Sequence, residues 1–169
     1  MKTFNIAVLI FGTAIFFSCR EKIEIINTSI SNAEPTQVVK DFVTTYTDSA
    51  NLQLRLSAPI LKKYGKLDEP YTDFDEGLTV YFYEGSKEPS AQLTSKFAQY
   101  LESERLWVVR DSVVAINTRG EILETELLYW DEVKELIYTD KFVRITQDDQ
   151  IITGRGLESD PQFSERSLF

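Results

Sequence analysis

Carboxylates are the most numerous side chains in this sequence that could do chemistry. The 169 residues include 27 Asp and Glu against 18 Lys and Arg, and there is no histidine. Without histidine the chain lacks the commonest general base, the Ser-His and Cys-His nucleophile pairs and most zinc ligand sets. Two carboxylates flanking a cleft could still hydrolyse a glycosidic bond. Most of the 27 acidic residues, however, fall in expected turns or on the outward side of expected strands. This placement favours a solvated surface, with an exported glycosidase as an alternative.

An acidic run at Asp73–Gly77 (DFDEG) is a candidate calcium loop. An EF-hand loop needs glycine at its sixth position, and Leu78 stands there. The chain also lacks a Gly-x-Ser-x-Gly motif, a phosphate loop and any Cys/His ligand spacing. We therefore predict no catalytic residue, no metal site and no cofactor. The formal net charge of -9 argues against nucleic acid as a partner, because phosphates are bound by clustered Lys and Arg.

Cys19 is the single cysteine, and it ends an apolar N-terminal stretch that runs from Phe4 to Phe17. As a helix this stretch would reach about 21 Å at ~1.5 Å per residue, short of the ~30 Å hydrocarbon core. It is typical of an export signal, and the Ser18-Cys19 junction resembles a bacterial lipoprotein signal with an acylated cysteine. An uncleaved N-terminal helix is the alternative. We expect a signal or anchor over residues 1–19, a flexible tether over 20–35 and a folded domain over 36–169.

The folded domain is organised around Gly120–Ile145, where two apolar strand-like runs flank the charged turn Asp131–Glu135. This pattern predicts an antiparallel hairpin whose faces are both largely covered. Related units precede and follow it: a shift of 30 pairs Leu93 with Leu123, and a shift of 29 pairs Leu128 with Leu157. Such a period favours a stack of antiparallel hairpins. Any all-β protein with evenly spaced hairpins would also align partly with itself.

Four further runs are typical of strands, since glycine is sparse and aromatic and β-branched residues are plentiful. They are Thr36–Thr47, Asn51–Pro59, Leu78–Tyr83 and the terminal run Gln162–Phe169. Pro59 is expected to end its strand because proline cannot donate to a β-ladder. Lys62–Gly77 is polar and is expected to be a turn-rich insert.

The inward side chains of such a sheet either fill a dry core or leave a slot for an apolar ligand. Burying a few hundred Å² of acyl chain in a slot would gain several kcal/mol, at about 25 cal/mol per Å². Composition is compatible with both possibilities. An exported, tethered β-sheet protein without catalytic residues is thus either a lipid-binding module or a scaffolding or adhesive lipoprotein with a solid core.

The segment Arg119–Asp131 (RGEILETELLYWD), with IYTDKFVRIT and IITGRGLESDPQFS after it, resembles the LptC family and its OstA-like relatives. The family's repeated pattern is occupied by Gly120, Leu123, Thr125, Leu128, Trp130 and Asp131. The resemblance implies an all-β fold, namely an elongated, open V-shaped antiparallel β-jellyroll with an N-terminal anchor. It also implies a non-catalytic, periplasmic protein tethered to the inner membrane.

The same resemblance implies partners and site residues. Lipid A acyl chains of lipopolysaccharide would pass from an inner-membrane ABC transporter, through an apolar groove, to an LptA-like bridge protein bound by strand pairing. The predicted groove residues are Leu54, Leu56, Val80, Phe82, Leu93, Tyr100, Leu123, Leu128, Trp130, Phe142, Ile145 and Ile152. The predicted partner edge is formed by Phe163, Glu165, Ser167 and Phe169, and Cys19 is the predicted lipid-attachment site. Strand register decides the groove list, because a slip of one residue, or a bulge at Glu126–Leu128, exchanges the two faces.

Overall fold

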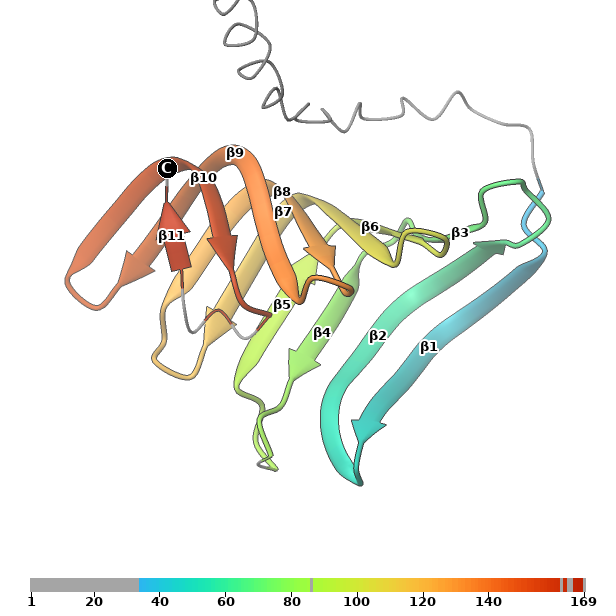
Figure 1. Cartoon of the computed structure of the whole chain (residues 1–169), viewed down its shortest axis with the longest axis horizontal. Coiled ribbons are helices and arrows are strands. Elements are labelled where there is room, and N and C mark those ends of the chain that lie inside the picture. The colour runs from blue at the N-terminus through green and yellow to red at the C-terminus, as the bar shows by residue number, and fades with distance from the viewer. Residues whose placement is uncertain (1–33, 86, 162, 164–165, 169) are drawn as a thin grey trace, which may run out of the picture. The chain divides into compact units, whose positions relative to one another are not determined.

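The protein is an antiparallel β-sheet protein in the computed structural model, which describes residues 34–85, 87–161, 163 and 166–168 (Figure 1). The eleven strands are β1 (Gln37–Asp48), β2 (Asn51–Tyr64), β3 (Tyr71–Phe74), β4 (Leu78–Phe82), β5 (Ala91–Ser95), β6 (Phe97–Leu101), β7 (Leu106–Asn117), β8 (Ile122–Asp131), β9 (Leu136–Gln147), β10 (Gln150–Ser159) and β11 (Arg166–Leu168). Within these described ranges, no helix is long and apolar enough to cross a membrane.

Two long strands, β2 and β7, divide the sheet into halves. β2 pairs with β4 through residues 54–57 and with β3 through residues 62–64. β7 pairs with β6 through residues 106–110 and with β5 through residues 114–117. We call the part that contains β4 and β5 half-sheet A and the part that contains β3 and β6 half-sheet B. β8, β9 and β10 continue both halves, and Figure 1 shows these long strands arching over.

Local irregularities interrupt several of the long strands. Asp41 in β1 and Asp111 and Ser112 in β7 have positive φ angles of 51°, 65° and 57°. The β7–β8 register shifts between Arg110 and Val113, and the β9–β10 register shifts beside Gly156, whose φ is 89°. Bulges bend and twist a strand, so their alignment folds the sheet over on itself. The result is consistent with the β-jellyroll that the sequence predicted.

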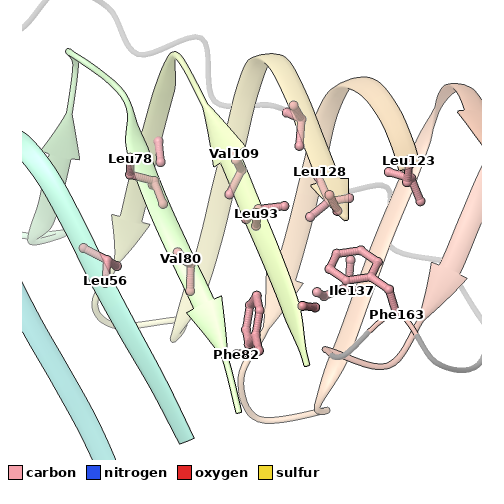
Figure 2. Packing of buried hydrophobic residues seen from close by; sticks show 14 of the residues in the cluster. Leu56, Leu78, Val80, Phe82, Leu93, Val109, Leu123, Leu128, Ile137 and Phe163 are labelled. Atoms are coloured by element: carbon pink, nitrogen blue, oxygen red, sulfur yellow. The ribbon is translucent and has the colours of Figure 1, made fainter. Parts of the chain in front are cut away.

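The apolar interior lies between the two half-sheets and is built from rows of paired residues. In half-sheet A one row crosses seven strands in register, through Leu56, Val80, Leu93, Ala115, Leu123, Ile145 and Ile152. All but Ile152 are at most 3% exposed. In half-sheet B a row runs through Phe74, Ala98, Val109 and Leu128. Residues of both rows belong to one hydrophobic cluster, part of which Figure 2 shows. Each fully buried Leu or Val contributes about 1.5–3 kcal/mol.

The repeat of 30 residues that the sequence predicted is visible in the backbone. The turn before β7 ends at Arg105 with φ 53°, and the turn before β9 ends at Glu135 with φ 52°. The amide of Glu102 donates to the carbonyl of Pro70, and that of Glu132 donates to the carbonyl of Arg105. The predicted hairpin over 120–145 is confirmed as β8 and β9. The charged turns of successive hairpins lie beside one another along one rim of half-sheet B.

Three boundaries differ from the sequence-based expectations. β2 continues through Pro59 to Tyr64, because Pro59 lies between the β4 and β3 pairings on one side and at the position that the β1 ladder skips, opposite Asp41, on the other. The polar segment 62–77, expected to be an insert, contains β3, which pairs with β2 and β6. The terminal strand excludes Phe163, and within the described residues β11 covers Arg166–Leu168 and pairs with β10.

The turn between β8 and β9 is held by Asp131. Its Oδ1 accepts the amide hydrogens of Val133 and Lys134 at 3.0 Å each, and its Oδ2 lies 2.8 Å from Lys134 Nζ. Burial raises the pKa of this carboxyl, but the hydrogen bonds and the charge of Lys134 outweigh burial, so its pKa is lower than usual. Ionised Asp131 therefore stabilises the folded state above the usual Asp pKa, and this stabilisation is lost as the pH falls through the lowered value.

We expect Asp131→Asn to lower the free energy of unfolding by about 1 kcal/mol at pH 7, because the Asn oxygen can still accept the two amide hydrogens but without the charge that strengthens these bonds. The gap between the two proteins should stay constant from pH 7 to pH 5 and shrink below about pH 4. Urea denaturation at several pH values measures it. Asp140→Asn is the control, because the Asp140 side chain is 73% exposed and its ion pair with Lys141, at 3.2 Å, is open to solvent. An equal loss in both variants at every pH would contradict the role of Asp131.

Candidate functional site

A cavity of about 1020 Å³ opens between the two half-sheets. Its apolar lining comes from β2 and β4, with Leu54, Leu56, Leu61 and Phe82, and from aromatic residues of β1, β3 and β6–β8. Ligand pockets usually measure about 300–1,000 Å³, so this cavity is at the upper end of that range. It is therefore large enough for a sizeable apolar ligand.

The aromatic wall of the cavity is a continuous series of ring contacts across five strands. Phe42 meets Phe74 at 6.4 Å between ring centroids, Phe74 meets Trp107 at 5.5 Å, and Trp107 meets Trp130 at 6.1 Å. Trp130 meets Phe82 at 5.6 Å, edge to face. Aromatic pairs at 4.5–7 Å contribute about 0.5–1.5 kcal/mol beyond their area. The wall is thus stable in itself, and both tryptophans of the chain belong to it.

Two glutamates, 30 residues apart, hold polar groups at the rim of half-sheet B. Glu132 accepts a hydrogen bond from Trp107 Nε1 at 2.8 Å and from Tyr100 Oη at 3.4 Å, and it pairs with Arg105 at 3.4 Å. Burial, and then the neighbouring Glu132 charge, raise the pKa of Tyr100, which therefore stays a neutral donor. Glu102 pairs with Lys63 at 2.8 Å and accepts a hydrogen bond from Thr72 at 3.3 Å. Each carboxylate ties its turn to the preceding repeat and fixes part of the cavity wall.

The interior under β8–β10 is filled. Leu128, Ile137, Val143 and Leu157 are each 0% exposed, and Phe163, at 2%, packs into the same cluster (Figure 2). The protein therefore combines the two interiors that the sequence left open: a dry core at one end and an open cavity beside it.

The predicted groove residues fall into three groups. Leu54, Leu56, Phe82, Tyr100 and Trp130 line the cavity. The inward residues that belong to the core without lining the cavity are Val80, Leu93, Leu123, Leu128, Ile145 and the partly buried Ile152. Phe142 points outward and is 61% exposed.

The inward orientation predicted for Phe142 is therefore wrong. The register of β8 and β9 shifts between Thr125 and Tyr129, and Val143 takes the inward position instead. The buried positions of β9 alternate regularly, with Ile137, Thr139, Val143 and Ile145 inside, so Phe142 and Ile145, three residues apart, cannot share the inward face. The irregularity lies at Glu126–Leu128, where the sequence analysis considered a bulge, and it exchanges the faces of β8, since Thr125 and Leu128 are both buried.

The predicted partner edge also needs correction. Phe163 is a core residue, 2% exposed, and lies outside β11, so it presents no side chain at an edge. Ser167 lies in β11 and is exposed. Glu165, Phe169 and the predicted lipid-attachment residue Cys19 lie outside the described residues.

Sequence reasoning missed three aromatic residues of the wall, Phe42, Phe74 and Trp107. Phe74 was hidden in the polar run that became β3. Trp107 joins the wall through strand pairing, since it lies opposite Tyr100 on β6 and Trp130 on β8. In the sequence, the shift of 30 residues that pairs Leu93 with Leu123 also pairs Tyr100 with Trp130.

The cavity contains few features of catalytic chemistry. Burial raises the pKa of the Asp73 carboxyl, while a hydrogen bond from Gln99 lowers it in part, but Asp73 is not a lining residue. Across the described ranges, no three Asp, Glu, Cys or His side chains are grouped to hold a metal ion. The geometry is that of a binding cavity with an apolar floor and a charged rim.

Residues 6–165 match the family described as lipopolysaccharide-assembly, LptC-related. The chain belongs to this family. LptC-related proteins are transport components that act in lipopolysaccharide transport, in the periplasm and in association with the inner membrane. The resemblance noted in the sequence is thereby confirmed over nearly the whole chain. A comparison with curated proteins gave no match.

Proposed function

We propose that this LptC-related protein carries lipid A acyl chains of lipopolysaccharide in the cavity between its half-sheets. The observation that supports the proposal is the aromatic wall from Phe42 to Phe82, which faces an open cavity and not a filled core. Covering a few hundred Å² of acyl chain there gains several kcal/mol, at about 25 cal/mol per Å². Such binding holds a lipid in water and still releases it to a partner.

The direction of transport follows from the partners in this proposal. An inner-membrane ABC transporter supplies the lipid and the energy, so this subunit uses neither a nucleotide nor a catalytic residue. The β10–β11 edge is the surface on which an LptA-like bridge protein would pair a strand, because β11 is the last strand in the sheet order. An acylated Cys19, or an uncleaved N-terminal helix, would tether the domain of residues 36–169 to the inner membrane.

A scaffolding lipoprotein without a lipid ligand is the second candidate. The filled interior under β8–β10 favours it, because Leu128, Ile137 and Leu157 leave no space there. The two candidates differ in what the cavity near β1–β4 contains in the cell.

Photo-cross-linking at Trp130 separates these candidates. A photo-reactive residue at Trp130 should form a lipopolysaccharide adduct that depends on ATP and on the transporter. Tyr129 is the matched control, because it precedes Trp130 on the same strand and stacks on Tyr138 at 5.1 Å, away from the cavity lining. Adducts are detected by a mobility shift and an antibody against lipopolysaccharide.

Two results would contradict the proposal. An adduct at Tyr129 but not at Trp130 would place the lipid on the outer face of half-sheet B. No adduct at either position, in cells whose transporter is active, would favour the scaffolding function.

A further inference from the structure

The charged residues that line the cavity are mostly acidic. They are Asp48, Glu102, Glu132, Glu135 and Asp160, against the basic Lys63 and Arg105. We propose that the cavity selects lipids whose head group carries few negative charges and disfavours heavily phosphorylated head groups. This inference rests on the proposed function, since it specifies the class of lipid that the same cavity accepts.

Except for Asp48, which ends β1 at the turn to β2, the acidic residues are concentrated on one side of the cavity. Glu102 and Arg105 lie in the turn between β6 and β7, Glu132 and Glu135 lie in the turn between β8 and β9, and Asp160 follows β10. These turns form the rim of half-sheet B, whereas the floor is apolar, with Leu54, Leu56 and Leu61 from β2. An amphiphile whose acyl chains lie on this floor would present its head group to the acidic rim.

Both cations of the lining already have acidic partners. Lys63 lies 2.8 Å from Glu102, and Arg105 lies 3.4 Å from Glu132. A phosphate would have to compete with a carboxylate for either cation, and it would remain beside further acidic groups. Sugar hydroxyls meet no such penalty, because a hydroxyl can donate to a carboxylate oxygen. The rim therefore fits a sugar head group with few phosphates better than one with many.

The strength of this selection depends on salt. Two charges in solvent interact over about a Debye length, ~10 Å at 0.1 M salt and ~3 Å at 1 M. A repulsive rim should therefore weaken binding of a phosphorylated lipid at low salt, and added salt should restore it. Selection by cavity shape would have no such dependence.

The experiment compares monophosphoryl and bisphosphoryl lipid A with the same acyl chains. Each is titrated into the full-length protein, and the fluorescence of Trp107 and Trp130 reports binding, because both tryptophans line the cavity. We expect the monophosphoryl lipid to bind roughly five- to tenfold more tightly at ~50 mM salt, and the difference to fall below about twofold at ~0.5 M salt.

Glu135→Lys should reduce the preference at low salt by about threefold or more, since it replaces a repulsive charge on the lining by an attractive one. Glu104→Lys is the control: it makes the same change on an exposed residue of the neighbouring turn that does not line the cavity. Glu132 is kept because it positions Trp107.

The outcomes separate the two proposals. Equal binding of both lipids at low salt, or tighter binding of the bisphosphoryl lipid, would overturn the inference and leave lipid binding standing. A change of preference as large in Glu104→Lys as in Glu135→Lys would also overturn it. Failure of both lipids to change the fluorescence would instead count against the proposed function.

Discussion

Phe163→Ala is expected to lower the free energy of unfolding by about 3–5 kcal/mol, the usual cost of removing a buried aromatic ring. The side chain is 2% exposed and belongs to the same cluster as Leu123 and Ile137 (Figure 2). The surrounding residues come from several strands of a bent sheet, so they cannot all move to fill the space. Urea denaturation at pH 7, monitored by far-ultraviolet circular dichroism, measures the change.

Phe142→Ala is the matched control for Phe163→Ala. The same atoms are removed, but the Phe142 side chain is 61% exposed, so the expected change is within about 0.5 kcal/mol. The pair is informative because the sequence predicted the opposite arrangement, with Phe142 inside and Phe163 at an edge. A larger loss for Phe142→Ala than for Phe163→Ala would mean that the orientation of β9 and the position of Phe163 are both wrong.

The parts of the fold that were predicted correctly depend on local patterns. The β8–β9 hairpin was recognised from two apolar runs and the charged turn between them. The row through Leu56, Val80 and Leu93 follows from alternation within each strand, and the repeat then placed Leu123 beside Leu93 as its equivalent. Period-two alternation fixes a face as long as the strand has no bulge.

The errors have two sources. Phe142 was placed on the inward face together with Ile145, although residues three apart on a regularly alternating strand face opposite sides, and Val143 is buried instead. The bends of β1 and β7 lie at Asp41, Asp111 and Ser112, which have no glycine to mark them. Non-glycine residues with positive φ are uncommon, so composition gives little warning of them.

The cavity could be predicted only in part because its wall is assembled from pairings between strands. Tyr100, Trp107 and Trp130 become neighbours when β6, β7 and β8 align, and this alignment requires the bulge at Asp111 and Ser112. Each aromatic residue alone is compatible with a dry core. The open volume arises because β2 turns from β4 to β3 and spreads the half-sheets apart.

That separation depends on tight packing where the chain crosses between the half-sheets. Gly77 is a residue in this region at which an added side chain would have no room. It lies between β3 and β4 with φ 87°, and its amide donates to the carbonyl of Phe74 at 3.3 Å. A Cβ atom built on Gly77 would lie 2.5 Å from the carbonyl oxygen of Ser95 and 3.3 Å from Lys96 Cα. Both neighbours are backbone atoms, so no side chain can rotate away.

We expect Gly77→Ala to lower the free energy of unfolding by about 3–5 kcal/mol, because a strained φ costs about 1–3 kcal/mol and the overpacking adds a similar amount. Gly120→Ala is the matched control: its φ is 74°, but its Cβ would meet no atom within 4 Å, so about 1 kcal/mol is expected. The difference in urea denaturation between the two variants measures the close approach of the β3–β4 and β5–β6 connections. Equal losses would mean that these connections are not in contact, and the bend that opens the cavity would then need another explanation.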